Sequence, residues 1–406
     1  MRETILRRGF NSEVHPFPVI PVRAASAGSA VPHATVDIGA EYGQPNANEA
    51  QNSRLGTRVP TPPWTLAWEA KFDASLRPYY VLQSGDRVVV RANQWLLYDT
   101  RGELVRTGGI DGGPVVMDSF TKRFYRIDPA GAMQAADLPA GDGGYMYFPA
   151  LGDQFSRVNI GVRGSRVMIA GIERDLDPHG GNPATQSSLE IMDAGDSPKT
   201  DVAGMIEGHR RIGQLYVPGT KLAVAVHGER IVAAAPGAVY ITNWDLEAVQ
   251  AIEAAFEPVS MSLDETGRIY LVAAKEEKTS LWVMNAAGER SYIWDFPPGA
   301  APPRTPPIIA YDHTVFLAGG RVIYAIGTDG KLNWSRTTTG AIAGAVVTAN
   351  NYLLVSEGSE IAAYNLEGKR QSLFKFEQEL LTAPILTAPG QVLVAGAGRL
   401  YCLQSR

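Results

Sequence analysis

The chain contains 406 residues, of which 45% are hydrophobic, 42 are glycine and 27 are proline. This length exceeds that of one ordinary compact domain, and the abundance of turn formers favours many short strands over long helices. The formal net charge of −5 and the lack of long lysine or arginine runs argue against a nucleic-acid partner, which requires a concentrated basic surface.

The first segment, residues 1–60, has no hydrophobic periodicity and is rich in Pro, Ala, Ser, Gly and Asn. Such a composition predicts an extended, largely irregular arm. The stretches ILRRGF and HPFPVIPV nevertheless supply apolar side chains that we interpret as partner-binding residues, namely Ile5, Leu6, Phe10, Phe17 and Ile20. Burying several of them against a partner would offset part of the entropy lost when the arm becomes ordered.

The same segment lacks the apolar core of about 7 to 15 residues that marks a signal peptide. No run in the chain approaches the roughly 20 apolar residues of a membrane helix. By these criteria alone we expect no export signal, a cytoplasmic location, and no insertion of this chain into a membrane.

From residue 78 onward three landmarks recur in a fixed order. A proline precedes a short apolar strand, as at Pro307 and Pro384. A turn followed by three or four apolar residues comes next, as in GDRVVV and GQVLVA, and a strand with aromatic side chains then ends in a turn glycine. The turn glycines Gly288, Gly330 and Gly368 lie 42 and 38 residues apart, a period typical of radial or stacked repeats.

Four short antiparallel strands in a period of about 40 residues predict the blade of a β-propeller. We therefore expect an all-β propeller over residues 61–406, preceded by the arm. The repeats indicate eight blades, or alternatively seven, because only 17 residues separate Pro114 from Gly131, where about 23 are usual in the other repeats.

The two ends of the repeat region are each incomplete. The last repeat, RLYCLQSR, stops at Arg406 before a fourth strand, whereas PWTLAWEAKF (residues 63–72) is a strand with no blade before it. We expect residues 63–72 to complete the last blade, because this pairing leaves no gap between the first and last blades. Trp68 is then expected to be buried.

The stretch IYAIGTDGKLNW (residues 323–334) contains Tyr324, Gly330 and Trp334, with looser copies around Gly288 and Gly368. This pattern resembles the tryptophan-docking (PQQ-like) repeat of quinoprotein-like propellers over roughly residues 64–406. That family includes quinone dehydrogenases and a non-catalytic propeller lipoprotein of outer-membrane barrel assembly, and the chain resembles the latter more. The resemblance implies the fold, a structural role for these five residues, and the extracytoplasmic location usual in the family.

The alcohol dehydrogenases of that family typically carry an adjacent Cys-Cys disulfide, a calcium with Glu and Asn ligands, and an Asp base. Cys402 is the only cysteine, and the acidic ligands cannot be aligned residue by residue. We therefore expect no catalytic residues and no cofactor, although glucose-dehydrogenase-like relatives do without the disulfide.

A metal site has one weak candidate, the acidic loop DLDPHGGN with Asp175, Asp177 and His179. Oxygen ligands spaced by two can hold Ca²⁺, but no glutamate follows at the twelfth position of a calcium loop. A solvated insertion loop is the favoured interpretation. The six histidines show no pair at metal-ligand spacing and are interpreted as surface or blade residues.

The favoured functional hypothesis is a non-enzymatic scaffold, a protein–protein interaction subunit of a larger assembly whose N-terminal arm docks on a partner. The alternative is a quinone-dependent or other small-molecule oxidoreductase that uses the central funnel of the propeller. A sugar-binding or hydrolytic propeller, with acidic residues at one mouth, is a third hypothesis. A propeller fold alone does not distinguish them, because this fold carries enzymes and scaffolds alike.

Overall fold

The structure is a computed structural model. It describes residues 63–84 and 86–108, only strands between residues 109 and 209, and residues 210–405 apart from 248, 302, 304, 388 and 389. Within these ranges every regular element is a strand. The described part of the chain contains no apolar helix of membrane-spanning length.

The described strands form eight four-stranded antiparallel sheets. The first sheet comprises β2 (Tyr80–Ser84), β3 (Arg87–Arg91), β4 (Trp95–Asp99) and β5 (Leu104–Gly108). The second comprises β6 (Val115–Asp118), β7 (Arg123–Ile127), β8 (Met133–Asp137) and β9 (Gly144–Tyr147). The third comprises β10 (Ser156–Arg163), β11 (Arg166–Glu173), β12 (Gln186–Asp193) and β15 (Arg210–Pro218), and the small hairpin β13 (Lys199–Thr200) and β14 (Ile206–Glu207) is inserted before its last strand.

The remaining sheets follow in chain order. The fourth comprises β16 (Ala223–His227), β17 (Arg230–Ala235), β18 (Ala238–Asn243) and β19 (Gln250–Glu253). The fifth comprises β20 (Glu257–Leu263), β21 (Ile269–Lys275), β22 (Lys278–Met284) and β23 (Arg290–Asp295). The sixth comprises β24 (Ile308–Ile309), β25 (Val315–Gly319), β26 (Val322–Ile326) and β27 (Leu332–Thr337). The seventh comprises β28 (Ile342–Val347), β29 (Leu353–Glu357), β30 (Glu360–Tyr364) and β31 (Arg370–Lys375).

The last sheet, which we call the closing sheet, joins the two ends of the propeller region. It comprises β32 (Ile385–Leu386), β33 (Gln391–Gly396), β34 (Arg399–Ser405) and, as its outermost strand, β1 (Trp64–Lys71). Strand β1 pairs antiparallel with β34, with Trp68 opposite Cys402. The predicted closure by residues 63–72 is therefore confirmed.

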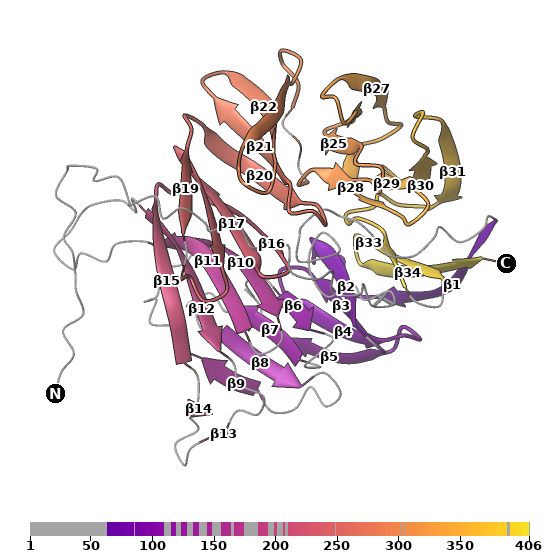
Figure 1. The fold of residues 1–406 in the computed structure, drawn as a ribbon. Helices are drawn as coiled ribbons and strands as arrows, with labels where there is room; N and C mark the ends of the chain where they lie inside the picture. The colour runs from indigo at the N-terminus through magenta and orange to yellow at the C-terminus, as the bar shows by residue number, and fades with distance from the viewer. Residues whose placement is uncertain are drawn as a thin grey trace, which may run out of the picture.

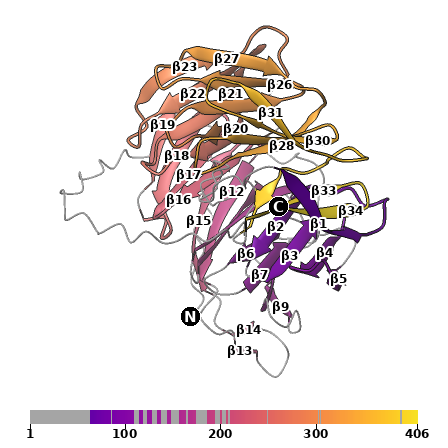
Figure 2. The same cartoon turned by 90° about the vertical axis from the view of Figure 1, so that its right-hand side faces the viewer.

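The sheets are arranged in a ring. Strand β2 lies against β6 on one side and against β33 of the closing sheet on the other, and β16 and β24 lie against β20 and β28 in the same way. In Figure 1 the sheets follow one another from indigo to yellow until the yellow closing sheet lies beside β2 and β3. The view in Figure 2 shows the same succession from the side. The first strand of each sheet is thus the inner one, and the fourth lies at the outer rim.

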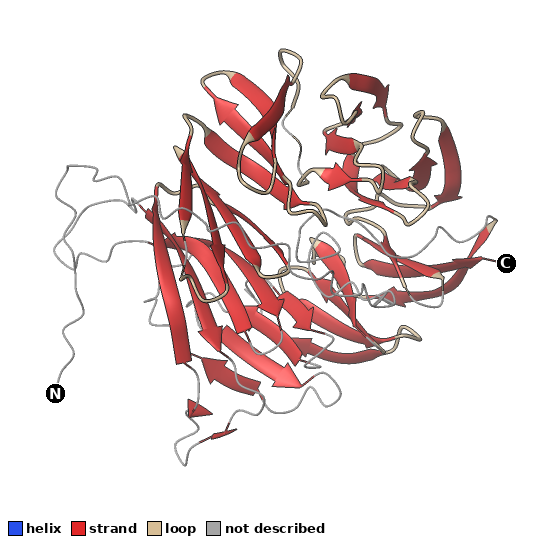
Figure 3. Ribbon diagram, in the orientation of Figure 1, coloured by secondary structure: helices blue, strands red, loops and turns tan. Residues whose placement is uncertain are grey.

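Burial follows from this arrangement, because each sheet has a neighbour on both faces. The second strands read as short apolar runs and are buried almost throughout, as in β17 and β25, which is the pattern of a strand covered on both faces. In contrast, the outer strand β5 is mostly exposed, and β31 has only exposed and partly buried residues. Figure 3 shows that strands and loops make up all of the coloured chain.

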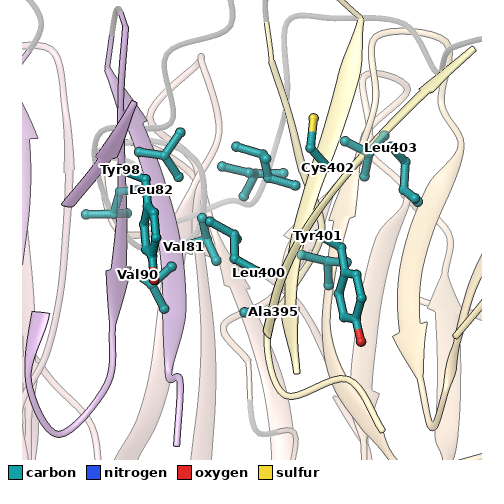
Figure 4. Packing of buried hydrophobic residues seen from close by; sticks show 14 of the residues in the cluster. Val81, Leu82, Val90, Tyr98, Ala395, Leu400, Tyr401, Cys402 and Leu403 are labelled. Carbon is teal, nitrogen blue, oxygen red and sulfur yellow. The ribbon is translucent and has the colours of Figure 1, made fainter. Parts of the chain in front are cut away.

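The junction between the closing sheet and the first sheet is packed like the rest of the ring. In Figure 4 Leu400 points toward Val81 and Leu82, whereas Tyr401 points to the opposite face of the closing sheet. The ring of Tyr401 packs against Phe376, with centroids 4.8 Å apart. Cys402 is fully buried, and burial raises the pKa of its thiol to about 12.

Neighbouring sheets are also joined at the rim by one repeated contact, in which an outer-strand side chain packs over the turn glycine of the next sheet. At each of these glycines φ is between +74° and +83°, and a Cβ atom would lie less than 3.0 Å from that side chain, so only glycine fits. The pairs are Ile252 with Gly288, Tyr292 with Gly330, Trp334 with Gly368 and, across the closure, Trp68 with Gly102.

The remaining predicted structural residue, Tyr324, also lies between two sheets. Its ring centroid lies 5.4 Å from that of Trp294 and 5.9 Å from that of Phe296, both at the outer edge of the fifth sheet. The indole N–H of Trp334 donates a hydrogen bond of 2.6 Å to the carbonyl oxygen of Leu366 in the seventh sheet. Aromatic side chains therefore fill the space between blades, as the repeat pattern predicts.

Two details differ from the expectations. Counting Gly131 as a repeat turn glycine assumes that FYRI, just before it, is the third strand of its repeat, but FYRI belongs to β7, the second strand of its sheet. The 17 residues from Pro114 to Gly131 therefore do not correspond to the interval of about 23 residues in the other repeats. Trp68 is only partly buried: its ring lies at the rim, where it covers Gly102. Trp64, four residues earlier on β1, is the buried tryptophan of this strand, with 5% of its surface exposed. The blade number stays a prediction, to which the eight sheets lend support.

Candidate functional site

Two sets of predicted site residues lie outside the described residues. These are the apolar residues of the arm (Ile5, Leu6, Phe10, Phe17 and Ile20) and the loop candidates for a metal ion (Asp175, Asp177 and His179). The predictions made for them stay predictions. The candidate sites below are built from the described residues.

The first candidate is the part of the rim where the arm joins the ring. We call this region the closing rim and define it by the outer strands β1 and β5, which belong to neighbouring sheets. Leu66 on β1 is 45% exposed, and Leu104 and Val105 on β5 are 53% and 50% exposed. These aliphatic side chains are exposed on the outer strands of two neighbouring sheets, and one of these strands, β1, is the strand to which residues 1–62 connect.

The exposure of β5 has a local cause in the sequence. Four residues after the turn glycine, β23 has Tyr292 and β27 has Trp334, and both pack over the next sheet. At the corresponding position β5 has Arg106, and the whole strand from Leu104 to Thr107 is exposed. The outer strand of the first sheet thus lacks the aromatic side chain that packs over the next sheet from β23 and β27.

The closing rim is nevertheless firmly attached to the ring. Arg399 Nη1 lies 2.8 Å from Glu69 Oε1, which joins β34 to β1. The backbone N–H of Phe72 donates to the carbonyl oxygen of Gly398 at 2.9 Å, so the pairing continues past the end of β1. The arm is therefore linked to a strand that is held by backbone hydrogen bonds, an ion pair and a buried tryptophan.

A second candidate is a cluster of three ionisable side chains on two adjacent turns. Asp264 and Glu265 lie in the turn from β20 to β21, and His313 lies in the turn from β24 to β25. His313 Nδ1 lies 3.3 Å from Asp264 Oδ2, and His313 Nε2 lies 3.8 Å from Glu265 Oε1. Asp264 is fully buried, whereas His313 and Glu265 are 31% and 47% exposed at their side chains.

Hydrogen bonds hold the Asp264 carboxylate in place. Its Oδ1 accepts from the backbone N–H groups of Thr266 and Arg268 and from the Thr266 hydroxyl, and its Oδ2 accepts from the Tyr270 hydroxyl at 3.0 Å. Burial alone would raise the pKa of Asp264, but these hydrogen bonds together lower it below its ordinary value. Asp264 is therefore a fixed negative charge at neutral pH.

One feature of the sequence marks His313 as unusual, although the six histidines were interpreted above as surface or blade residues. His313 has φ +66° and occupies the same turn position as Gly267, Asn351 and Gly390, which also have positive φ. In each turn this residue donates its backbone N–H to the carbonyl three residues earlier. A histidine in a position otherwise filled by Gly or Asn was visible in HTVFLA, but its carboxylate partners lie almost fifty residues away in the sequence.

A third cluster has a structural explanation. Glu357, fully buried, accepts hydrogen bonds at Oε1 from Arg370 Nε at 2.7 Å and Thr339 Oγ1 at 3.0 Å, and at Oε2 from the Tyr364 hydroxyl at 2.6 Å. Arg370 Nη2 also lies 2.7 Å from Glu360 Oε1. Desolvation would lower the pKa of Arg370, but these two carboxylates raise it. All of these groups except Thr339, which lies between β27 and β28, belong to the seventh sheet, so the cluster connects the strands of that sheet at its turns.

Comparison with known proteins supports the architecture. No family profile matches the chain, and no curated protein matches its sequence significantly. Among solved structures, Sqt1 from Saccharomyces cerevisiae is 12% identical with a TM-score of 0.59, covering 83% of this chain and 98% of Sqt1. BamB from Moraxella catarrhalis is 12% identical with a TM-score of 0.57, covering 84% of this chain and 99% of BamB.

The chain has a β-propeller fold. The fold class expected from the repeats is thus confirmed. At this level of identity the two structures establish the fold alone, and the function has to be argued from the surface of this propeller.

Proposed function

We propose that this propeller is a non-enzymatic scaffold, a protein–protein interaction subunit whose N-terminal arm and closing rim bind a protein partner together. The observation that supports this most is the attachment of the arm. Residues 1–62 connect to β1, the outermost strand of the closing sheet; Leu66 is exposed on β1, and Leu104 and Val105 are exposed on β5, the outer strand of the neighbouring first sheet. A partner seated on the closing rim would be within reach of the apolar residues of the arm.

The chemistry of the closing rim suits a protein partner. The outer edge of β5 has no neighbouring strand among the described residues, and such an edge offers backbone donors and acceptors to an added strand. Exposed leucine and valine side chains add apolar area that becomes buried on contact, at about 25 cal/mol per Å². The flanking Arg106, which is exposed, would favour a partner with some acidic character.

We also infer that the repeats are of the quinoprotein-like kind. The packing of Trp334 over Gly368 and of Tyr292 over Gly330 supports this inference, because it repeats an aromatic-on-glycine contact between blades. We propose no cofactor. The adjacent Cys-Cys pair expected for the alcohol dehydrogenases has no counterpart in a chain whose only cysteine, Cys402, is buried in the closing sheet.

Brief proteolysis of the isolated protein should remove the arm and leave the propeller from about residue 60 intact. We expect the trimmed propeller to keep its melting temperature but to lose co-assembly with the native partner, because the arm supplies part of the buried apolar area. Size-exclusion chromatography of both forms with their native assembly measures this. A second variant separates the apolar side chains from the length of the arm. It is the full chain with serine at the five apolar positions of the arm (Ile5, Leu6, Phe10, Phe17 and Ile20), and it should lose assembly as the trimmed form does. Equal assembly of all three proteins would remove the arm from the proposal.

The oxidoreductase alternative is tested with pyrroloquinoline quinone. We expect no saturable binding of the quinone with Ca²⁺ in a fluorescence titration, and no dye-linked oxidation of alcohols or glucose. The physical reason is the lack of an alignable set of calcium ligands and of the vicinal disulfide that holds the quinone in alcohol dehydrogenases. Stoichiometric micromolar binding would favour the alternative over the scaffold.

A further inference from the structure

We propose that Asp264, Glu265 and His313 form a binding site for a divalent transition-metal ion of the zinc class, which links the turns of the fifth and sixth sheets. One ligand atom from each of the three side chains lies within 4.8 Å of the others. Two carboxylates and one imidazole are a ligand set that proteins use for zinc. The site is independent of the scaffold proposal, because it lies in different sheets from the closing rim.

The distance between two of the candidate ligand atoms favours a metal ion over a simple hydrogen bond. His313 Nδ1 is buried and makes no hydrogen bond, although it lies 3.3 Å from Asp264 Oδ2. Two ligands at the usual zinc distances of about 2.0–2.2 Å, separated by a tetrahedral angle, lie about 3.3–3.5 Å apart. The observed separation is therefore that of two neighbouring ligands around a tetrahedral ion.

The electrostatics of the cluster also favour a dication. With a neutral imidazole, the two carboxylates carry two negative charges, and Asp264 is held in its charged form by its hydrogen bonds. Arg268 lies close enough to interact with Asp264 and offsets one of these charges. A net negative charge remains, so a divalent cation is attracted, and Oδ2 of Asp264 has only the Tyr270 hydroxyl as a donor.

The remaining ligand is Glu265, the more exposed of the two carboxylates. Glu265 is 47% exposed at its side chain and lies beside the other imidazole nitrogen, Nε2, at 3.8 Å. Its ligand oxygen lies within 4.8 Å of the ligand atoms of Asp264 and His313. Water supplies the fourth ligand, since His313 and Glu265 both reach the surface.

A neighbouring turn of the chain suggests a substitution that removes the imidazole without straining the backbone. Asn351 occupies the corresponding position in the next turn with φ +58°, so His313→Asn removes the imidazole and retains a residue that tolerates this backbone conformation. Glu265→Gln removes the negative charge of the exposed carboxylate. His227→Asn changes a histidine at the end of β16 in another sheet, and the triple variant Asp175→Asn, Asp177→Asn, His179→Gln removes the loop candidate.

The experiment titrates the full chain, without an affinity tag, with Co²⁺ and Zn²⁺ at pH 7.5. We expect one Co²⁺ to bind with the intense visible absorption of a tetrahedral site, and Zn²⁺ to displace it and raise the melting temperature. His313→Asn should weaken binding more than about 100-fold. Losing a residue that only hydrogen-bonds to a metal ligand costs about 10–100-fold, and losing a ligand itself should cost more. Glu265→Gln should weaken it less, and His227→Asn and the triple variant should leave it unchanged.

A pH series adds a second readout. Because protons compete with the metal ion for its ligands, affinity should fall as the pH is lowered from 7.5. If His313→Asn binds Co²⁺ as tightly as the unchanged chain, or if the unchanged chain binds neither ion, the proposal is wrong. In the second case the cluster is a contact between the two turns that holds no metal ion.

Discussion

Replacing Trp64 by alanine should lower the free energy of unfolding by about 3–5 kcal/mol, the usual cost of removing a buried aromatic side chain. Trp64 is 5% exposed and belongs to the core shared by the closing sheet and its neighbours. Because β1 is the strand that closes the ring, the loss also weakens the packing of the closing sheet. Urea unfolding, followed by fluorescence and circular dichroism, measures the change.

Two further positions on β1 serve as controls for this prediction. Trp68→Ala should cost less, about 1–3 kcal/mol, because Trp68 is only partly buried over Gly102. Leu66→Ala, at a position 45% exposed, should change stability by less than about 0.5 kcal/mol. Equal stabilities of the Trp64 and Leu66 variants would contradict closure of the ring by this strand.

Replacing Arg370 by methionine should destabilise the protein by about 3–5 kcal/mol, since removing one partner of a buried ion pair leaves an uncompensated charge. Glu357 is fully buried and would keep only the Thr339 and Tyr364 hydroxyls as donors. Differential scanning calorimetry at pH 7 measures this change as a lower melting temperature.

The double variant Arg370→Met, Glu357→Gln should recover part of the loss, because it removes the stranded charge. Lys369→Met, an exposed neighbour on the same turn, should change stability by less than about 0.5 kcal/mol. If Arg370→Met is as mild as Lys369→Met, the ion pair contributes little, and Glu357 is stabilised by the two hydroxyls.

The repeat could be predicted from the sequence at positions where a turn or close packing allows only one type of residue. A glycine with positive φ beneath an aromatic ring is required at Gly330 and Gly368, so these positions mark the third strand and the turn after it. The incomplete last repeat and the isolated strand before residue 73 correctly predicted the pairing of β1 with β34. Both are local patterns, which a single sequence can display.

What the sequence failed to predict depends on contacts between distant segments. FYRI looks like a third strand but forms the second, because apolar and aromatic runs occur in both kinds of strand. Trp68 was expected to be buried, yet the degree of burial depends on how far its ring overhangs Gly102 at the rim. The approach of His313 to Asp264 arises only when the fifth and sixth sheets pack side by side.

The most direct test of the scaffold proposal is lysine cross-linking of the native assembly followed by mass spectrometry. Lys71 lies exposed on β1 at the closing rim, whereas Lys331 and Lys278 lie exposed on the sixth and fifth sheets. The proposal predicts that cross-links to the partner concentrate on Lys71 and the arm, and that the double variant Leu104→Asp, Val105→Asp abolishes them. Leu332→Asp, at a leucine that is 44% exposed on the outer strand of the sixth sheet, should leave them unchanged. Cross-links concentrated on Lys278 and Lys331, unchanged by the β5 substitutions, would contradict it.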